Sequence, residues 1–281
     1  TYFRAPDLLA RIFTEVARRH EVLRTTFTYS AGAPAQVVGP EPRLDLPVVN
    51  LTYLPEAEWE AKAAELAREE LRRPFDLRRG PLLRLSLLRF AEDEQVLLVT
   101  MHHIATDGWS MGILMREIGA LYEAFSQGSP SPLPELPVQY ADFAAWQRSW
   151  LSGESLQGEI AWWRERLDGA PAVLDLPTDR PRPPVPSQRG AVRPLRLPAD
   201  LTRDLINLGH QEGATLFMVV LTGLDALLYR YTGQGDLVVG TPVAGRDALE
   251  TEGLIGFFVN TLALRTDLSG DPTFRELLQR V

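Results

Sequence analysis

The sequence predicts an α/β protein built from two lobes. Segments whose apolar residues recur with the 3.6-residue period of a helix alternate along the chain with short runs of strand-like composition. A connector at 175–190 holds five prolines, which cannot lie inside a helix or a central strand. With 281 residues, of which 45% are hydrophobic, the chain is long enough for two cores. We therefore expect an N-terminal lobe over 1–174, the connector, and a C-terminal lobe over 191–281.

The N-terminal lobe is predicted to open with a helix, because Leu8, Ile12, Phe13 and Val16 share one helical face. A polar "AEDE" between two apolar runs then predicts a strand hairpin. The expected elements after the first helix are a strand around 23–29, a Pro/Gly-rich loop at 32–47, a helix over 56–73, strands at 82–90 and 95–103, a helix that ends near 126, and helices over 140–150 and 159–167.

The C-terminal lobe is expected to repeat this mixture of helices and strands. Its apolar runs are short where they read as strands and longer where they keep a helical period. The expected elements are a strand at 191–197, a helix over 199–211, a very apolar helix over 215–231, strands at 236–243 and 255–265, and a closing helix.

The composition excludes several classes of protein. The net charge of −8 argues against nucleic acid or an acidic membrane surface as a partner. The chain has no cysteine, which excludes disulfides, thiolate metal sites and a cysteine nucleophile, and fits a cytoplasmic location. No apolar run reaches the roughly 18 residues of a membrane span, so no membrane association is expected.

Residues 101–110, "MHHIATDGWS", allow two chemical interpretations. His102 and His103 with Asp107 resemble acid–base machinery at the end of a strand, where α/β proteins often place their sites. Gly108 to Gly112 instead fits G-x-S-x-G, the turn that presents the nucleophile of serine hydrolases, with Ser110 as that nucleophile. A purely structural interpretation also stands: hydrogen-bonded histidines, and a turn in which Ser110 caps the next helix.

The hydrolase interpretation lacks its partners. The only histidine downstream of Ser110 is His210, which lies in a helical pattern, and no oxyanion loop precedes the motif. A metal site from His102, His103 and Asp107 is less favoured still. Strand alternation sends the two histidines to opposite sides, and no third ligand is placed beside them, so we expect no metal.

Five ordered stretches resemble one family. They are "RHEVLRTTF" (19–27), "MHHIATDGWS" (101–110), "YADFAAWQ" (140–147), "GDLVVGTPVAGR" (235–246) and "IGFFVNTLALR" (255–265). Together they are similar to the core motifs of the condensation domains of nonribosomal peptide synthetases. The resemblance implies a two-lobed chloramphenicol-acetyltransferase-like fold with a tunnel between the lobes. It also implies an acyltransferase that forms an amide between a donor acyl thioester and an acceptor aminoacyl thioester in secondary-metabolite biosynthesis.

The resemblance also assigns roles to residues. The second histidine of H-H-x-x-x-D-G, His103, is implied to be catalytic, with His102 and Gly108 beside it, either as a base or by positioning the amine. Asp107 is implied to be structural and to pair with Arg19, and Arg24 to brace the site. Ser110 then becomes a helix cap rather than a nucleophile. The residues implied to line the tunnel or face substrate are Trp109, Ser110, Tyr140, Asp142, Trp146 and Asn260.

The implied partners are upstream and downstream peptidyl carrier proteins and a neighbouring adenylation domain. The carriers deliver substrates on phosphopantetheine, and no cofactor is implied to bind the chain directly. Further motifs of the family are expected before residue 1 and after residue 281, so the second lobe is expected to be incomplete and the fragment to be inactive by itself. A carrier-independent acyltransferase and a non-catalytic docking segment stay open as alternatives, whereas the D-x-x-x-x-D of cyclisation domains is absent.

Overall fold

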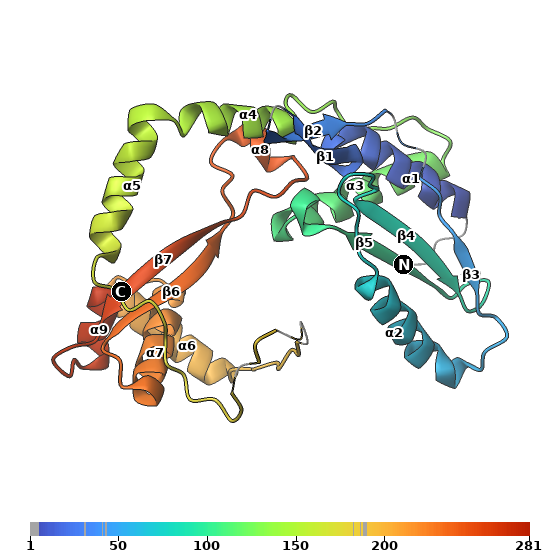
Figure 1. Cartoon of the computed structure of the whole chain (residues 1–281). Helices are drawn as coiled ribbons and strands as arrows, with labels where there is room; N and C mark the ends of the chain where they lie inside the picture. Colours follow the sequence, from blue (N-terminus) through green and yellow to red (C-terminus); the bar gives the residue numbers. More distant parts are fainter. Residues whose placement is uncertain are drawn as a thin grey trace. The chain divides into compact units, whose positions relative to one another are not determined.

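The computed structural model describes residues 6–30, 32–40, 42, 44–181, 183–185, 187 and 190–281. They form a mixed α/β structure, as predicted, in two compact units (Figure 1). The first unit comprises Thr1–Ser155 with Val243–Asn260, and the second Leu156–Pro242 with Thr261–Val281. This division differs from the one expected at 175–190, because the chain leaves the first unit near Ser155 and returns to it for residues 243–260. The described part of the connector holds neither helix nor strand.

The first unit contains a three-stranded sheet and a separate hairpin. In the sheet, β3 pairs parallel to β4 and β4 antiparallel to β5, with Leu83 opposite Met101; in the hairpin, β1 pairs antiparallel to β2. The elements are α1 (Pro6–Arg19), the 3₁₀ helix η1 (Glu21–Arg24), β1 (Thr25–Ser30), β2 (Ala33–Val38), β3 (Val48–Asn50), α2 (Glu56–Arg72), β4 (Leu83–Arg89), β5 (Gln95–Met101), the 3₁₀ helix η2 (His103–Ala105), α3 (Gly108–Ser126), α4 (Tyr140–Trp150), the start of α5 (Gly153–Leu167), and α8 (Leu249–Glu252).

The two faces of this sheet bury different sets of side chains, because successive residues of a strand point to opposite sides. From β4, Leu85 and Leu87 join the main core with α1 and α3, whereas Leu88 faces the other way into a smaller cluster with α2. Figure 1 shows α1 and α3 on one side of the sheet and α2 on the other. The sheet thus fixes α3, which follows the 101–110 motif.

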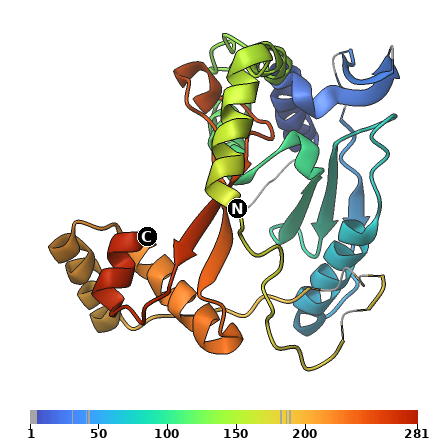
Figure 2. The same cartoon turned by 60° about the vertical axis from the view of Figure 1, so that its left-hand side comes forward.

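The second unit packs helices beside a two-stranded sheet. Leu237 of β6, Leu268 after β7 and Leu277 of α9 form one cluster with α7, and α6 packs on α7 through Ala214 and Val219 (Figure 2). Gly213 and Gly233 end α6 and α7 with positive φ angles of 67° and 70°, a conformation that glycine adopts without a Cβ clash. The elements are α6 (Ala199–Glu212), α7 (Leu216–Thr232), β6 (Asp236–Val243), β7 (Asn260–Asp267) and α9 (Phe274–Arg280).

Three predicted features differ from the structure. Residues 191–197 form no strand, and the strand expected over 255–265 begins only at Asn260. The loop expected at 32–47 instead contains β2, whose Pro34 lies in a two-stranded hairpin where a missing N–H is tolerated.

In the described part of the chain, no single helix has the length and apolar composition to cross a membrane. Helices α6 and α7 meet the test only when taken together, and they are bent by 104°.

Candidate functional site

Asp107 is the central anchor of the 101–110 motif. It is the N-cap of α3: its Oδ1 accepts hydrogen bonds from the backbone N–H of Ser110 at 2.8 Å and from the Ser110 hydroxyl at 2.7 Å. Its Oδ2 accepts the N–H of Phe258 at 3.1 Å. The side chain is fully buried. Burial alone raises the pKa of Asp107, but the hydrogen bonds from Ser110 and Phe258 and the charge of Arg246 outweigh it, so the pKa is lowered.

The cation that balances Asp107 is Arg246, and the expected pairing with Arg19 is wrong. Arg246 Nη2 lies 3.2 Å from Asp107 Oδ1, and Nη1 donates to the carbonyls of Thr251 at 2.6 Å and Leu254 at 2.8 Å. Its guanidinium lies 3.9 Å from the centre of the Phe258 ring. Burial lowers the pKa of Arg246 while Asp107 raises it, and an arginine stays protonated in a protein.

Arg19 forms a different buried network. Its Nη2 donates to Glu117 on α3 at 3.0 Å, and His20 Nε2 lies 3.1 Å from the same carboxylate. Burial raises the pKa of Glu117, but the hydrogen bonds from His20 and Arg19 lower it below its usual value. Arg19 pairs with Glu117 because it ends α1, which packs against α3. Arg24 lies outside both networks: it donates to Gly39 O and pairs with Glu21.

His103 is exposed, and one of its ring nitrogens is already engaged. Its Nδ1 lies 2.6 Å from Thr106 O, and a carbonyl oxygen only accepts, so Nδ1 carries the proton. Nε2 therefore keeps its lone pair and can accept a proton or a hydrogen bond. The ring meets Phe257 edge-on, with centroids 5.2 Å apart and planes at 86°. Because Nδ1 and Phe257 both restrict the ring, its orientation is defined.

His102 is oriented away from that environment. Its Nδ1 accepts the N–H of Ile104 at 3.0 Å, which caps η2, and its ring meets Phe75 edge-on at 5.5 Å. The two histidines thus contact different elements, as strand alternation predicts. His102 has the contacts of a structural residue.

Ser110 is neither exposed nor a helix cap. It is fully buried, its hydroxyl lies 2.7 Å from Asp107 Oδ1 and 3.0 Å from Gly256 O, and it receives the Gly256 N–H at 3.1 Å. Asp107, not Ser110, caps α3. A nucleophile must reach its substrate beside a base, and no histidine of the described chain contacts Ser110, so the serine-hydrolase interpretation and the expected substrate-facing position are wrong.

Residues 255–258 form what we call the strap, in place of the strand expected there. Each of its residues is fixed by a side chain from elsewhere in the first unit: Ile255 N donates to His20 Nδ1 at 3.2 Å, Gly256 contacts Ser110, Phe257 O accepts from Tyr140 at 2.8 Å, and Phe258 N donates to Asp107. A Cβ on Gly256 would clash with the rings of Tyr140 and Phe258, so the strap needs glycine here.

The remaining expected residues divide into two groups. Tyr140 is half-buried, and burial raises its pKa. Asp142 is exposed and caps α4 by accepting the Gln139 N–H at 2.8 Å, so its position is explained by the helix. Trp146 is 56% exposed and stacks on Trp150 at 5.9 Å. Asn260 starts β7 and is exposed.

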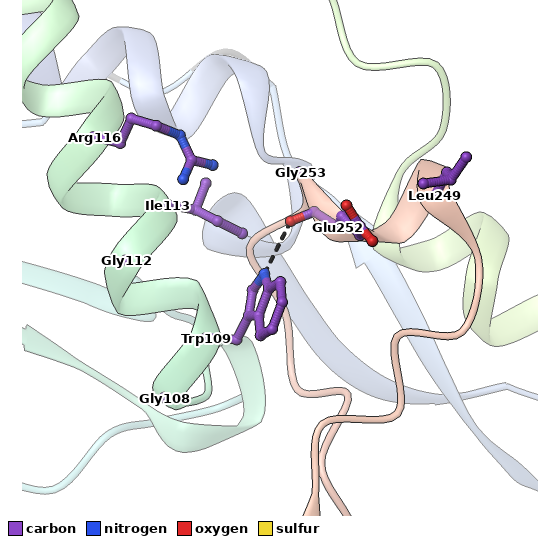
Figure 3. Close-up of a pocket in the computed structure, with 8 residues that line it drawn as sticks. All are labelled: Gly108, Trp109, Gly112, Ile113, Arg116, Leu249, Glu252 and Gly253. Carbon is purple, nitrogen blue, oxygen red and sulfur yellow. Dashed lines mark hydrogen bonds between the residues drawn. The ribbon is translucent and has the colours of Figure 1, made fainter.

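A pocket of about 630 Å³ adjoins the first turns of α3. Trp109 forms one wall, with its indole N–H donating to Glu252 O at 3.0 Å, and Arg116 lies further along the helix (Figure 3). A Cβ added at Gly108 or Gly112 would meet no atom within 4 Å, so these glycines leave the pocket open. Trp109 is 50% exposed, which leaves its ring available to a ligand.

Sequence reasoning missed Arg246, His20 and Phe257. The signal for Arg246 was the arginine that ends "GDLVVGTPVAGR", since a buried aspartate requires a cation. Nothing in the sequence joins His20 to Ile255, because 235 residues separate them. Among the described residues, no three His, Asp or Glu side chains are grouped as metal ligands.

Comparison with known proteins places this arrangement in a family. The family model "Condensation domain" matches residues 4–281. One of the proteins that make up the linear gramicidin synthase of Brevibacillus parabrevis is 54% identical over 264 residues, which are 94% of this chain and 3% of that protein. The phosphinothricin tripeptide synthetase PhsC of Streptomyces viridochromogenes is 47% identical over 266 residues, 95% of this chain and 24% of that protein. The chain thus spans a small part of the length of these relatives.

Solved structures agree with the sequence relatives. The X-domain from teicoplanin biosynthesis aligns with a TM-score of 0.89 and 35% identity over 99% of this chain and 62% of that one. The SgcC5 protein from Streptomyces globisporus aligns with a TM-score of 0.76 and 33% identity over 98% of this chain and 62% of that one. Since the family model covers nearly the whole sequence, this chain belongs to the condensation domain family of nonribosomal peptide synthetases.

Proposed function

We propose that the chain forms amide bonds between two thioesters, with His103 acting on the attacking amine. The observation that carries this proposal is the state of the His103 ring. It is exposed, its Nδ1–H is donated to Thr106 O at 2.6 Å, and its Nε2 lone pair is therefore directed away from that bond. Family membership supplies the type of reaction, and this geometry supplies the residue.

The reaction needs orientation more than strong base catalysis. An α-amino group has a pKa of about 7.7–8.0, so a useful fraction is already unprotonated near neutral pH. The amine nitrogen attacks the thioester carbon, the C–S bond breaks, and the proton lost by the amine passes to the departing thiolate. His103 Nε2 accepts a hydrogen bond from the amine, aligns it and carries that proton in part. Alignment supplies up to about 7–11 kcal/mol and proton transfer about 10²–10⁴ in rate.

The donor and acceptor are proposed to arrive on phosphopantetheine arms of an upstream and a downstream peptidyl carrier protein, with an adenylation domain as neighbour. Synthetases among the relatives support this context. The pocket beside Trp109 is proposed to admit part of one reactant. Its length along α3 and its mixed lining, an indole ring and the Arg116 guanidinium, suit a chain that carries both apolar and anionic groups.

The test is turnover with loaded carriers. His103→Ala is expected to reduce product formation on the acceptor carrier by about 10² or more, measured by intact-protein mass spectrometry, while carrier binding is preserved. His210→Ala is the matched control, because His210 is exposed on α6 in the second unit. Unchanged turnover in folded His103→Ala protein would contradict the proposal.

Two other functions are separated by the same assay. SgcC5 has been crystallised with a free naphthyl ethanediol, which favours an acyltransferase whose acceptor is not carrier-bound. The X-domain has been solved in complex with OxyB, which favours a docking role. Turnover of a free amine or alcohol at the carrier-bound rate indicates the first function. Carrier binding without any turnover, in the chain within its native polypeptide, indicates the second.

A further inference from the structure

His20 is a fully engaged histidine outside the 101–110 motif. It follows α1 and is 1% exposed. Its Nδ1 lies 3.2 Å from Ile255 N, and its Nε2 lies 3.1 Å from Glu117 Oε2. One imidazole therefore connects the end of α1, the middle of α3 and the start of the strap.

These two partners define the tautomer of His20. A backbone N–H only donates, so Nδ1 must offer a lone pair to Ile255. The Glu117 carboxylate only accepts when ionised, and its lowered pKa keeps it ionised at neutral pH, so Nε2 must carry the hydrogen. Both requirements select the same neutral Nε2–H ring.

The strap transmits this bond to the His103 ring. His20 holds Ile255, which is 1% exposed, at one end of the strap. Two residues later, the Phe257 ring packs edge-on against His103 at 5.2 Å. Without a strand ladder over 255–258, the strap depends on side-chain hydrogen bonds for its position.

We propose that His20 is a positioning residue for His103: its imidazole fixes Ile255, and the strap then holds the Phe257 ring that sets the orientation of the His103 imidazole. The consequence for turnover rests on the proposed function, whereas the consequence for the strap does not. The side chain acts through Phe257 and does not touch the reactants.

Two substitutions separate the two bonds of His20. In His20→Asn, the amide oxygen takes the place of Nδ1 and still accepts the Ile255 N–H, while the bond to Glu117 is lost. In His20→Gln, the amide nitrogen reaches the place of Nε2 and still donates to Glu117, while Ile255 N–H loses its acceptor. Each variant gives up one hydrogen bond and part of a ring, so their melting temperatures are expected to fall by similar amounts.

The first readout is amide hydrogen exchange of residues 254–258 in the whole chain. Exchange there is expected to be accelerated about tenfold or more in His20→Gln and to stay near the wild-type rate in His20→Asn. ¹⁵N spectra of the four histidines are expected to show His20 protonated on Nε2 and His103 on Nδ1. Equal exchange in both variants, or an Nδ1–H tautomer of His20, would overturn the proposal.

The second readout is kcat with loaded carriers. His20→Gln is expected to lose about ten- to a hundredfold in kcat with little change in KM, since a small displacement of a catalytic group has this effect. His20→Asn is expected to restore most of kcat. Equal kcat loss in the two variants sinks the positioning role. If wild type shows no condensation while exchange still differs, the proposed function fails and the strap assignment stands.

Discussion

Asp107 and Arg246 lie 139 residues apart in the sequence and form a buried ion pair, with Arg246 Nη2 3.2 Å from Asp107 Oδ1. The pair joins the N-terminus of α3 to the segment that returns from the second unit. Side-chain exposure is 1% for Arg246 and 0% for Asp107, so neither charge is solvated by water. A buried ion pair contributes little against an apolar replacement, but the loss of one partner leaves an uncompensated charge.

Arg246→Met is therefore expected to destabilise the fold by about 3–5 kcal/mol, measured by urea unfolding. The double variant Asp107→Asn/Arg246→Met is expected to lose less than the sum of the two single losses, because neither charge is then left alone. Arg265→Met is the control: Arg265 pairs with Asp236 at a partly exposed site, so a much smaller loss is expected. Additive losses for Asp107 and Arg246 would show that the two residues are not coupled.

The elements on this pair show how far the sequence leads. The periodicity around Leu8–Val16 and after Ser110 predicted α1 and α3, and the alternation of β4 and β5 predicted the sheet, because these signals are local. The partner of Asp107 was predicted wrongly as Arg19. Both arginines lie in quoted motifs, and only the packing of α1 on α3 decides that Arg19 meets Glu117 instead.

The strap shows the opposite case. Residues 255–265 have strand composition, and β7 does begin at Asn260, but the segment before it is held by tertiary hydrogen bonds. Tertiary contacts override strand propensity there. Such contacts between residues more than 100 positions apart leave no periodic signal in one sequence.

The acid stability of the chain is expected to depend on Asp107 and Glu117. Their pKa values are lowered below 3.8 and 4.5, their ordinary values, so the unfolded chain takes up these protons before the folded chain does. Their contribution is fully present above about pH 4.5 and is lost as the pH falls through the folded-state values. Melting temperatures between about pH 6 and pH 3 check this.

Asp107→Asn and Glu117→Gln are expected to lower the melting temperature at pH 6 and to flatten its decline toward pH 3. The exposed Asp93→Asn serves as control, because it removes one carboxylate without removing a buried bond. A decline as steep in the two variants as in wild type would assign the acid sensitivity to other groups.

Asp225 on α7 is expected to show the reverse dependence on pH. It is fully buried, and neither carboxylate oxygen has a hydrogen-bond partner in the described structure. Burial raises the pKa of Asp225, and Thr266 opposes the shift only in part. The folded chain thus holds a proton that the unfolded chain releases above pH 3.8, so stability falls as the pH rises from 3.8 through the folded-state pKa.

Asp225→Asn removes this penalty and is expected to stabilise the chain at pH 7 by at least about 1 kcal/mol, with little gain below pH 3.8. The matched control is Asp204→Asn on the exposed side of α6, for which no gain is expected. Urea unfolding at both pH values measures the difference. A destabilised Asp225→Asn protein at pH 7 would mean that the carboxylate has a partner in solution.

Gly112 and Gly119 provide a matched test of the pocket on α3. Both are exposed glycines of the same helix, and a Cβ at either position meets no atom within 4 Å, but only Gly112 lines the pocket. Leucine in place of either glycine is expected to stabilise the helix by about 0.5–1 kcal/mol, because glycine is a poor helix former. The stability effects are therefore matched, and any difference in turnover belongs to the pocket.

With loaded carriers, Gly112→Leu is expected to raise KM for one of the two substrates by about tenfold, since the leucine side chain occupies space beside Trp109 that a reactant needs. Gly119→Leu is expected to leave KM unchanged. Separate titration of donor and acceptor carriers identifies which reactant uses the pocket, because only its KM changes. If both variants give wild-type KM values for both carriers, the pocket admits neither reactant, and Trp109 serves only through its hydrogen bond to Glu252 O.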